Sequence, residues 1–260
     1  MSLWIQLTYL WMLAALMMAL GWFWQRSRVN AGIVDVLWAG GTGMSAVLFA
    51  MSGDGAAWPR VILAVLGGLW GVRLTAHLWT RVRGEAEDGR YRNLRAHWNG
   101  SQFKFFLFFQ LQALLILLFS LPFLAVARNP HGFGAWMLIG IMIWLVSVIG
   151  EAIADSQLAR FRDDRANQGR TCREGLWRYS RHPNYFFEWL HWFAYVCLAL
   201  GSPVAYLAWA GPAVMYVFLR WISGIPYTET QALRSRGDDY RAYQRSTSMI
   251  IPWFPKRIEP

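Results

Sequence analysis

Seven arginines lie within 22 residues of this sequence, at positions 160, 162, 165, 170, 173, 178 and 181. A guanidinium is a planar fork that binds phosphate oxygens two at a time, so this cluster suits a ligand with several phosphate charges. The cluster ends in Arg181-His182-Pro183-Asn184-Tyr185, which leads directly into an apolar run. The alternative interpretation is an ordinary basic loop, placed in the cytoplasm by the positive-inside rule.

Four further polar residues lie beside or just inside the apolar segments at the two ends of this loop. They are Asp155, Asn184, Tyr185 and Glu188. Polar groups at the edge of a membrane are costly unless they have partners, so we expect them to bind one another or a ligand. For Glu188, the alternative is an ion pair within the membrane that has no ligand role.

A second set of polar residues lies within apolar runs nearer the N-terminus. Asp35 and Trp38 lie in one run, and Arg73 and His77 lie in the next. A carboxyl group held in apolar surroundings stays protonated and can donate a hydrogen bond to a carbonyl oxygen. The alternatives are an ion pair between Asp35 and Arg73 that only locks two helices together, and a role for His77 as an interfacial aromatic.

The elements that must position these residues are membrane-spanning helices. The chain has 260 residues, of which 56% are hydrophobic and only 15% are charged, and it contains 17 tryptophans. This composition is typical of an all-α polytopic membrane protein, in which an apolar run of about 20 residues spans the bilayer as a helix. We predict seven transmembrane helices, at about residues 3–24, 31–51, 60–79, 103–126, 134–154, 185–200 and 204–222.

Positive charge is distributed unevenly between the predicted loops. The loops after the first, third and fifth spans and the C-terminal tail hold two, six, seven and six lysines and arginines, whereas the opposite side holds only Arg60 and Arg128. The positive-inside rule therefore places the N-terminus outside and the C-terminus in the cytoplasm, as in a bacterial inner membrane or its equivalent. The arginine-rich loop then faces the cytoplasm.

Several other kinds of site have no support in the sequence. The two cysteines, Cys172 and Cys197, make neither a disulfide framework nor a metal site. The net charge of +10 is carried between hydrophobic runs without a nucleic-acid-binding motif, so we expect no nucleic-acid partner. Gly40-Gly-Thr-Gly43 lies inside an apolar span and, like Gly67 and Gly71, favours close helix packing over dinucleotide binding. We expect a single membrane domain over residues 1–260, which is a monomer in contact with membrane lipids.

The segment Gly175-Leu-Trp-Arg-Tyr-Ser-Arg-His-Pro-Asn-Tyr-Phe-Phe-Glu188 resembles the signature of the steroid 5-alpha-reductase C-terminal domain family, and of its bacterial branch in particular. The resemblance covers roughly residues 30–255. Gly84-Glu-Ala-Glu-Asp-Gly-Arg-Tyr-Arg92 resembles the family's Gly-Glu-Asp-x-Arg-Tyr element with one additional residue, and Pro252 matches its terminal Ile-Pro-Phe element. The broader superfamily includes sterol C=C reductases and isoprenylcysteine carboxyl methyltransferases, which share the Arg-His-Pro-Asn-Tyr core.

The resemblance implies that NADPH is the cofactor. In the family, the residues that match Asp155, Arg162, Arg170, Asn184 and Tyr185 surround NADPH. It also implies that Arg90 and Tyr91 lie at the adenine end, unless loop 84–92 is merely solvated, and that Glu229, Tyr240 and Tyr243 close over the nicotinamide half. The motif adds further candidates for cofactor binding, which are Arg173, Tyr179, Arg181, His182 and Glu188. Loops 80–104 and 156–184 and the tail 223–260 would form the lid over the cofactor.

The resemblance also implies reduction of an activated C=C bond in a lipophilic enone, such as a 3-oxo-Δ4 steroid, that enters from the bilayer. Hydride transfer to the β-carbon requires a hydrogen-bond donor on the carbonyl oxygen, where enolate charge develops. In the steroid reductases a glutamate of the second helix and a tyrosine of the third are the donors. Asp35 matches the first, but Leu78 stands where the tyrosine is expected.

This departure leaves three possibilities for the second donor. Either His77 or Arg73 supplies it, another tyrosine reaches the site, or the substrate is not a 3-oxo steroid. Our candidates for catalysis are Asp35 and His77, and those for substrate contact are Trp38 and Arg73.

Two other functions are compatible with the same residues. One is an S-adenosylmethionine-dependent methyltransferase of the isoprenylcysteine type, although a cofactor without phosphates does not need so many arginines. The other is a non-catalytic membrane protein that binds anionic lipid heads in the arginine-rich loop.

Overall fold

Helices account for all the regular structure of residues 2–256, which are the residues that the computed structural model describes; this part of the chain contains no β-strand. The α-helices are α1 (Leu3–Arg28), α2 (Ile33–Ser52), α3 (Ala57–Gly84), α4 (Gly89–His97), α5 (Gln102–Ala127), α6 (Ala135–Asp163), α7 (Pro183–Ala199), α8 (Ala210–Val217) and α9 (Ile225–Ser246). Shorter helical turns are η1 (Arg165–Asn167), η2 (Gly175–Arg178), η3 (Ala205–Trp209) and the π-helix η4 (Phe218–Ile222). The prediction of an all-α fold is therefore confirmed.

Five of these helices are long and apolar enough to cross a membrane, namely α1, α2, α3, α5 and α6. They correspond to the first five predicted spans, and the chain is accordingly a multi-pass membrane protein. The sixth predicted span forms α7, which has only 17 residues. The seventh is not one continuous α-helix, because it is divided into η3, α8 and η4. Pro203 and Pro212 lie in this region, and proline lacks the backbone N–H that a continuing helix needs.

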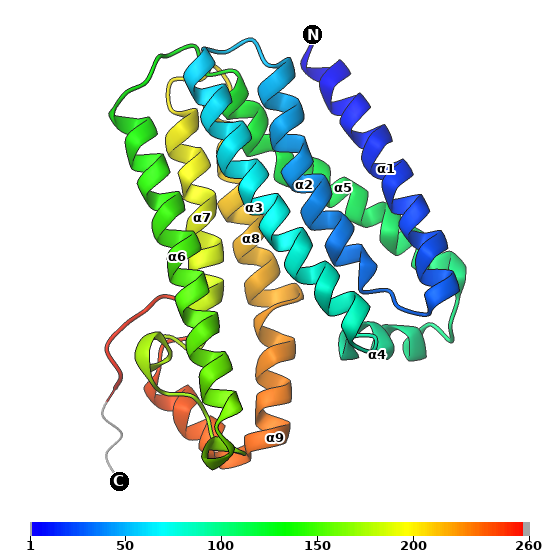
Figure 1. Cartoon of the computed structure of the whole chain (residues 1–260), viewed down its shortest axis with the longest axis vertical. Helices are drawn as coiled ribbons and strands as arrows, with labels where there is room; N and C mark the ends of the chain where they lie inside the picture. Colours follow the sequence, from blue (N-terminus) through cyan, green and yellow to red (C-terminus); the bar gives the residue numbers. More distant parts are fainter. Residues whose placement is uncertain (1, 257–260) are drawn as a thin grey trace. The chain divides into compact units, whose positions relative to one another are not determined.

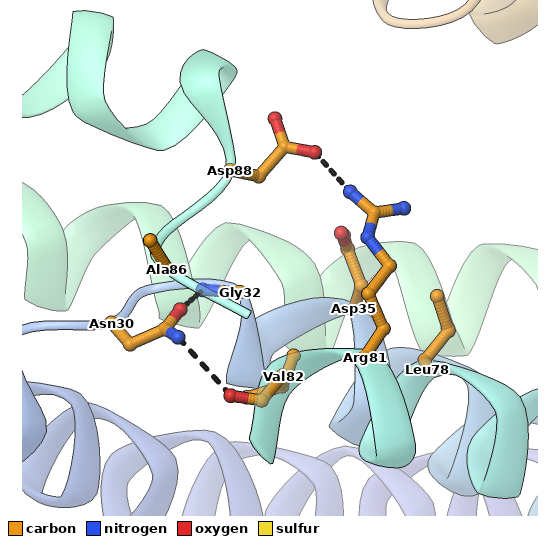
Figure 2. Close-up of a pocket in the computed structure, with 8 residues that line it drawn as sticks. All are labelled: Asn30, Gly32, Asp35, Leu78, Arg81, Val82, Ala86 and Asp88. Carbon is orange, nitrogen blue, oxygen red and sulfur yellow. Dashed lines mark hydrogen bonds and ion pairs between the residues drawn. The ribbon is translucent and has the colours of Figure 1, made fainter. Parts of the chain in front are cut away.

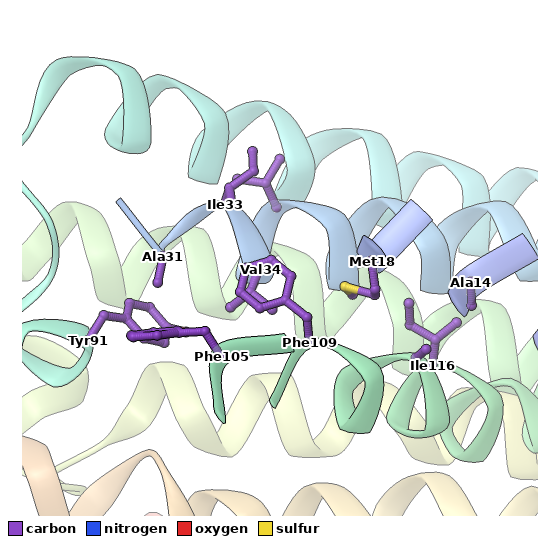
Figure 3. Close-up of a cluster of buried hydrophobic side chains, with 11 residues drawn as sticks. Ala14, Met18, Ala31, Ile33, Val34, Tyr91, Phe105, Phe109 and Ile116 are labelled. Carbon is purple, nitrogen blue, oxygen red and sulfur yellow. The ribbon is translucent and has the colours of Figure 1, made fainter. Parts of the chain in front are cut away.

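The described chain forms two compact units. Unit 1 comprises residues up to 138 together with 195–211, and unit 2 comprises residues 139–194 together with those from 212 onward. The core of unit 1 is a cluster of apolar side chains from α1, α2, α4 and α5 (Figure 3). Met18, Phe105, Phe109 and Ile116 are its most deeply buried large members.

Glycines allow α2 and α3 to lie side by side at backbone contact in unit 1 (Figure 1). A Cβ atom on Gly43 would come within 2.6 Å of the Cα of Gly71, and one on Gly71 would come within 2.5 Å of the Cα of Gly43. A Cβ atom on Gly67 would likewise come within 2.4 Å of the Cβ of Ala46. The predicted role of these glycines in helix packing is confirmed, and this contact fixes the position of Asp35 at the start of α2 relative to α3.

Unit 2 is built around the C-terminal part of α6, the arginine-rich loop, the start of α7, and α9. Gly150 of α6 lies against the ring of Phe187, where a Cβ would approach to 2.4 Å. Gly237 interrupts α9 with φ 53°, a conformation that favours glycine. The chain after α9 then returns along the loop, because the backbone N–H of Trp253 donates to the carbonyl of Tyr179 at 2.9 Å. The C-terminal tail therefore covers the segment that precedes α7.

We predict that Gly71→Ala destabilises the protein by about 1–3 kcal/mol, since the added methyl group must push α2 away from α3. Gly134→Ala is the matched control, because a Cβ added at Gly134 would meet no atom within 4 Å. The measurement is the thermal melting temperature in detergent. Equal melting temperatures for the two variants would contradict the close contact.

Candidate functional site

Asp35 lies in the first turn of α2 and is held by two residues of α4. The hydroxyl of Tyr91 donates to its Oδ1 at 2.6 Å, and the guanidinium of Arg90 lies 3.2 Å from its Oδ2. Sequence reasoning assigned Asp35 to catalysis and Arg90 and Tyr91 to the cofactor. The structure brings all three together in unit 1.

A small cavity lies beside this cluster, between the start of α2, the end of α3 and the loop that precedes α4 (Figure 2). Asp88 caps α4 by accepting the backbone N–H of Arg90 at 2.8 Å, and it also pairs with Arg81. Glu87 pairs with Arg95 at 2.7 Å. The cavity has a volume of about 20 Å³, which is room for roughly one water molecule. Loop 84–92 is thus fastened to the ends of α2 and α3 by charged contacts.

The electrostatics of this loop keep each group in the form that its contacts require. Burial alone would raise the pKa of Asp88, but the hydrogen bonds and charge of Arg90, together with Arg81, lower it overall. Burial raises the pKa of Tyr91 well above its usual value, and the negative charge of Asp35 raises it further. Tyr91 therefore remains a hydrogen-bond donor at neutral pH.

The other unit 1 candidates lie elsewhere. His77 is on an exposed part of α3 and is not among the residues that line the small cavity. Trp38 packs edge-to-face against Trp70 and Phe119, with centroid distances of 6.2 and 5.2 Å. Arg73 is half-buried on α3. The structure therefore does not gather Asp35, His77, Trp38 and Arg73 around that one cavity.

In unit 2, the two leading residues of the Arg-His-Pro-Asn-Tyr motif point inward to a single carboxylate. Arg181 donates to Oε1 of Glu229 at 2.8 Å, and Nε2 of His182 lies 3.2 Å from the same oxygen. Arg181 also donates to the carbonyls of Gln244 and Thr247. Both motif side chains are buried, and only 14% of the Glu229 side chain is exposed. This network fixes α9 and the tail to the start of α7.

Opposing effects set the charge of this network. Burial alone would raise the pKa of Glu229, but the hydrogen bonds from His182 and Arg181 and the charge of Arg181 lower it to about 2. Burial lowers the pKa of His182, and the hydrogen bond to Glu229 opposes that shift without cancelling it. At neutral pH, Glu229 is thus ionised and accepts hydrogen bonds from Arg181 and from neutral His182.

Two tyrosines of α9 complete the network. The hydroxyl of Tyr240 donates to Glu229 at 3.4 Å, and that of Tyr243 donates to the carbonyls of Trp177 and Ser180. Burial raises the pKa of both tyrosines, so both remain protonated donors. In this structure both hydroxyls bind protein groups, and the predicted closure of Glu229, Tyr240 and Tyr243 over the nicotinamide half stays a prediction.

The last two residues of the motif lie at the half-exposed N-terminus of α7. Asn184 donates to Asp155 of α6 at 3.0 Å. Tyr185 stacks on the ring of His182, with centroids 5.3 Å apart and planes 6° apart, and its hydroxyl is 3.2 Å from that of Thr228. Glu188 lies one helical turn beyond Asn184 on α7. The buried His182 and Thr228 thereby hold Tyr185 in one orientation.

A basic cavity lies beside this network in unit 2. Its volume is about 410 Å³. It is lined by Leu158, Phe161, Arg162, Asn167, Gln168, Gly169, Arg170, Ser235 and Arg236. Arg162 and Arg170, two predicted cofactor residues, both line it. Neither forms an ion pair with a carboxylate within residues 2–256, so their charge is available to an anion.

Arg173 and Tyr179 do not line this cavity. Arg173 pairs with Asp239 at 2.6 Å, and Asp239 also accepts the backbone N–H of Thr171. Tyr179 lines a separate apolar cavity.

Sequence reasoning missed Arg236 and Asp239. Arg236 belongs to the basic tail counted for topology, and nothing in its spacing indicated that α9 carries it to the arginine-rich loop.

Residues 21–247 match the family described as Protein of unknown function (DUF1295). The chain belongs to this family. The match includes Asp35, the loop before α4, the arginine-rich loop and all of α9. A relative in Schizosaccharomyces pombe, described as an uncharacterized protein, is 31% identical over 175 residues, which are 57% of this chain and 51% of the relative.

The chain thus matches about half the length of that curated relative. No solved structure matches the chain. The family membership is compatible with the resemblance to the steroid 5-alpha-reductase superfamily and does not extend to an activity.

We predict that Glu229 makes stability sensitive to acid. The pKa of Glu229 is about 2 in the folded protein, whereas a glutamate without these contacts has a pKa of 4.5. The contribution of Glu229 to stability is therefore complete above about pH 4.5 and is lost as the pH falls toward 2. The loss amounts to about 3 kcal/mol. Glu229→Gln should flatten this dependence, as measured by melting temperature in detergent between pH 6 and 3.

Asp238→Asn is the control, because Asp238 is exposed and pairs only with Arg241 in the described chain. This variant should keep the pH dependence of the wild type. If the melting temperature of Glu229→Gln fell as steeply with pH as that of the wild type, Glu229 would not be the source of the acid sensitivity.

Proposed function

We propose that the protein is an NADPH-dependent reductase of an activated C=C bond in a lipophilic enone, such as a 3-oxo-Δ4 steroid. The observation that carries this proposal is the basic cavity of unit 2. Arg162 and Arg170 bring two guanidinium groups to it without carboxylate partners in the described residues, and α9 adds Arg236. Family membership alone supports no particular reaction.

The residues of the basic cavity fit the phosphate portion of NADPH. Guanidinium groups bind phosphate oxygens two at a time, and NADPH carries a pyrophosphate and a ribose 2′-phosphate. The side-chain amides of Asn167 and Gln168 can donate further hydrogen bonds. A volume of about 410 Å³ lies within the range of about 300–1,000 Å³ for small-molecule sites. A methyltransferase cofactor without phosphates would leave these charges without partners.

The motif residues at the start of α7 would hold the opposite end of the cofactor. NADPH, when bound, supplies the hydride that adds to the β-carbon of the enone. Asn184 is fixed by Asp155, and Tyr185 is fixed by its stack on His182, so both present polar groups in defined orientations. Arg181 has a different role, because its guanidinium is used by Glu229 and two carbonyls. We assign Arg181 and Glu229 to positioning of the motif.

Polarisation of the substrate carbonyl would fall to the cluster around Asp35. Asp35 accepts hydrogen bonds from Tyr91 and Arg90. The only hydroxyl proton of Tyr91 is used in this contact, so Arg90 has N–H groups left for a carbonyl and Tyr91 would donate to it only by turning away from Asp35. Tyr91 would then take the place of the tyrosine that Leu78 replaces in α3. The adjacent cavity of about 20 Å³ is too small for a steroid, so a substrate would enter only if loop 84–88 moves aside.

The distribution of charge supports a specific topology for this activity. We propose seven spans, with α7 and the η3–α8–η4 segment added to the five long helices. The N-terminus would lie outside, and the arginine-rich loop and α9 would face the cytoplasm, where reduced nicotinamide cofactor is available. We propose a monomer.

We predict that NADPH at a hundredfold excess over its dissociation constant stabilises the purified protein by about 2.7 kcal/mol. Arg162→Gln and Arg170→Gln should each weaken NADPH binding by about tenfold or more, because each removes a charge-assisted contact. The measurement is thermal shift in detergent with NADPH, NADH and S-adenosylmethionine compared.

The matched control is Arg165→Gln, which changes an exposed arginine of η1 that does not line the cavity. It should bind NADPH like the wild type. A shift with S-adenosylmethionine alone would replace the reductase with the methyltransferase, and no shift with any of the three ligands would contradict the nucleotide site.

We also predict that Asp35→Asn lowers the rate of NADPH-dependent enone reduction by about 10²–10³-fold, because Tyr91 and Arg90 lose the charge that orients them. The NADPH thermal shift should be unchanged, since the basic cavity belongs to unit 2. The measurement is NADPH oxidation with a progesterone-like enone. A variant with full activity would show that Asp35 only fastens loop 84–92.

A further inference from the structure

An apolar groove runs along α6 in unit 2, separate from the basic cavity. Its volume is about 460 Å³, and the residues of α6 that line it are Val146, Ile149, Gly150, Ile153 and Gln157. Leu176 and Tyr179, from the segment around η2, line its other end with Phe187 of α7. The exposed isoleucines belong to a helix that is long and apolar enough to span the membrane. The groove therefore opens toward lipid tails.

Two arginines lie next to residues that line this groove. Residues 146, 149, 153, 157 and 160 of α6 are three or four positions apart, so Arg160 continues the stripe of lining residues one turn beyond Gln157. The guanidinium of Arg178 lies 6.0 Å from the ring of Tyr179, which lines the groove. Both arginines are exposed. Of the three acidic residues of α6, Glu151 and Asp155 fall on the opposite face of the helix, and Asp163 lies three positions after Arg160.

The C-terminal tail adds an aromatic rim beside Tyr179. The ring of Phe254 lies edge-on to Tyr179, with centroids 6.0 Å apart, and the backbone of Trp253 is fastened to the Tyr179 carbonyl. Trp253 is 70% exposed and Phe254 is 77% exposed. Exposed aromatic side chains next to a basic edge are typical of the headgroup level of a membrane.

We propose that this groove is a binding site for an anionic phospholipid, with one acyl chain along Ile149 and Ile153 and the phosphate at Arg160 and Arg178. The groove has the size of a small-molecule site, and its lining is apolar except for Gln157 and Tyr179, which are the lining residues nearest in sequence to the two arginines. Tyr179 lies at the junction, where its ring contacts the chain and its hydroxyl faces the headgroup region. The site is distinct from the basic cavity, whose α6 residues Leu158, Phe161 and Arg162 lie on another face.

The test is native mass spectrometry of the full-length protein in detergent, titrated with phosphatidylglycerol or phosphatidylcholine of identical acyl chains. Phosphatidylglycerol should bind about tenfold more tightly. Arg160→Gln and Arg178→Gln should each weaken phosphatidylglycerol binding roughly fivefold without changing phosphatidylcholine binding. Arg165→Gln is the matched control and should have no effect.

A second pair of variants tests the groove itself. Ile149→Trp fills it and should weaken both lipids, whereas Leu145→Trp, at an exposed α6 position outside the groove, should weaken neither. Equal affinity for the two lipids would overturn the headgroup assignment, and so would equal losses in Arg165→Gln. Unchanged binding in Ile149→Trp would overturn the groove. Because these readouts need no nucleotide, they are independent of the proposed reductase activity.

Discussion

The buried charge of Arg181 is the constraint on which the organisation of unit 2 depends. A guanidinium withdrawn from water needs a carboxylate and acceptors for its remaining donors. Glu229 and the carbonyls of Gln244 and Thr247 meet that need, and all three come from the last part of the chain. Neutralising one arginine of the motif therefore fixes α9 against the start of α7. The stack of Tyr185 on His182 and the contact between Asn184 and Asp155 rest on that arrangement.

Four of the seven arginines of the same stretch form two contrasting pairs by this criterion. Arg173 and Arg181 have carboxylate partners and hold the structure together. Arg162 and Arg170 have none within the described residues, although they face a common cavity. A protein gains little from gathering positive charges that repel one another unless an anion joins them. The shared cavity, more than the number of arginines, is therefore the basis for proposing Arg162 and Arg170 as ligand-binding residues.

The sequence was sufficient to predict the helices of the first five spans, because long apolar runs leave few alternatives in a membrane. It also predicted the packing glycines, since only a residue without a Cβ allows the contact between Gly43 and Gly71. It could not predict that Asp35 pairs with Arg90. These two residues are far apart in the sequence, and only the fold of loop 84–92 brings them together. Likewise, the break in the seventh predicted span depends on where prolines fall within an otherwise uniform apolar run.

The residues that line the basic cavity have a consequence for biosynthesis. Ser235 and Arg236 of α9 complete the cavity, and they emerge from the ribosome well after Arg162 and Arg170. The long apolar helices are inserted before the cavity exists, so an anion cannot assist their insertion. Ligand binding can act only on the finished chain, where it would join the arginine-rich loop to α9. Without an anion, the inserted chain would thus lack that link between the arginine-rich loop and α9.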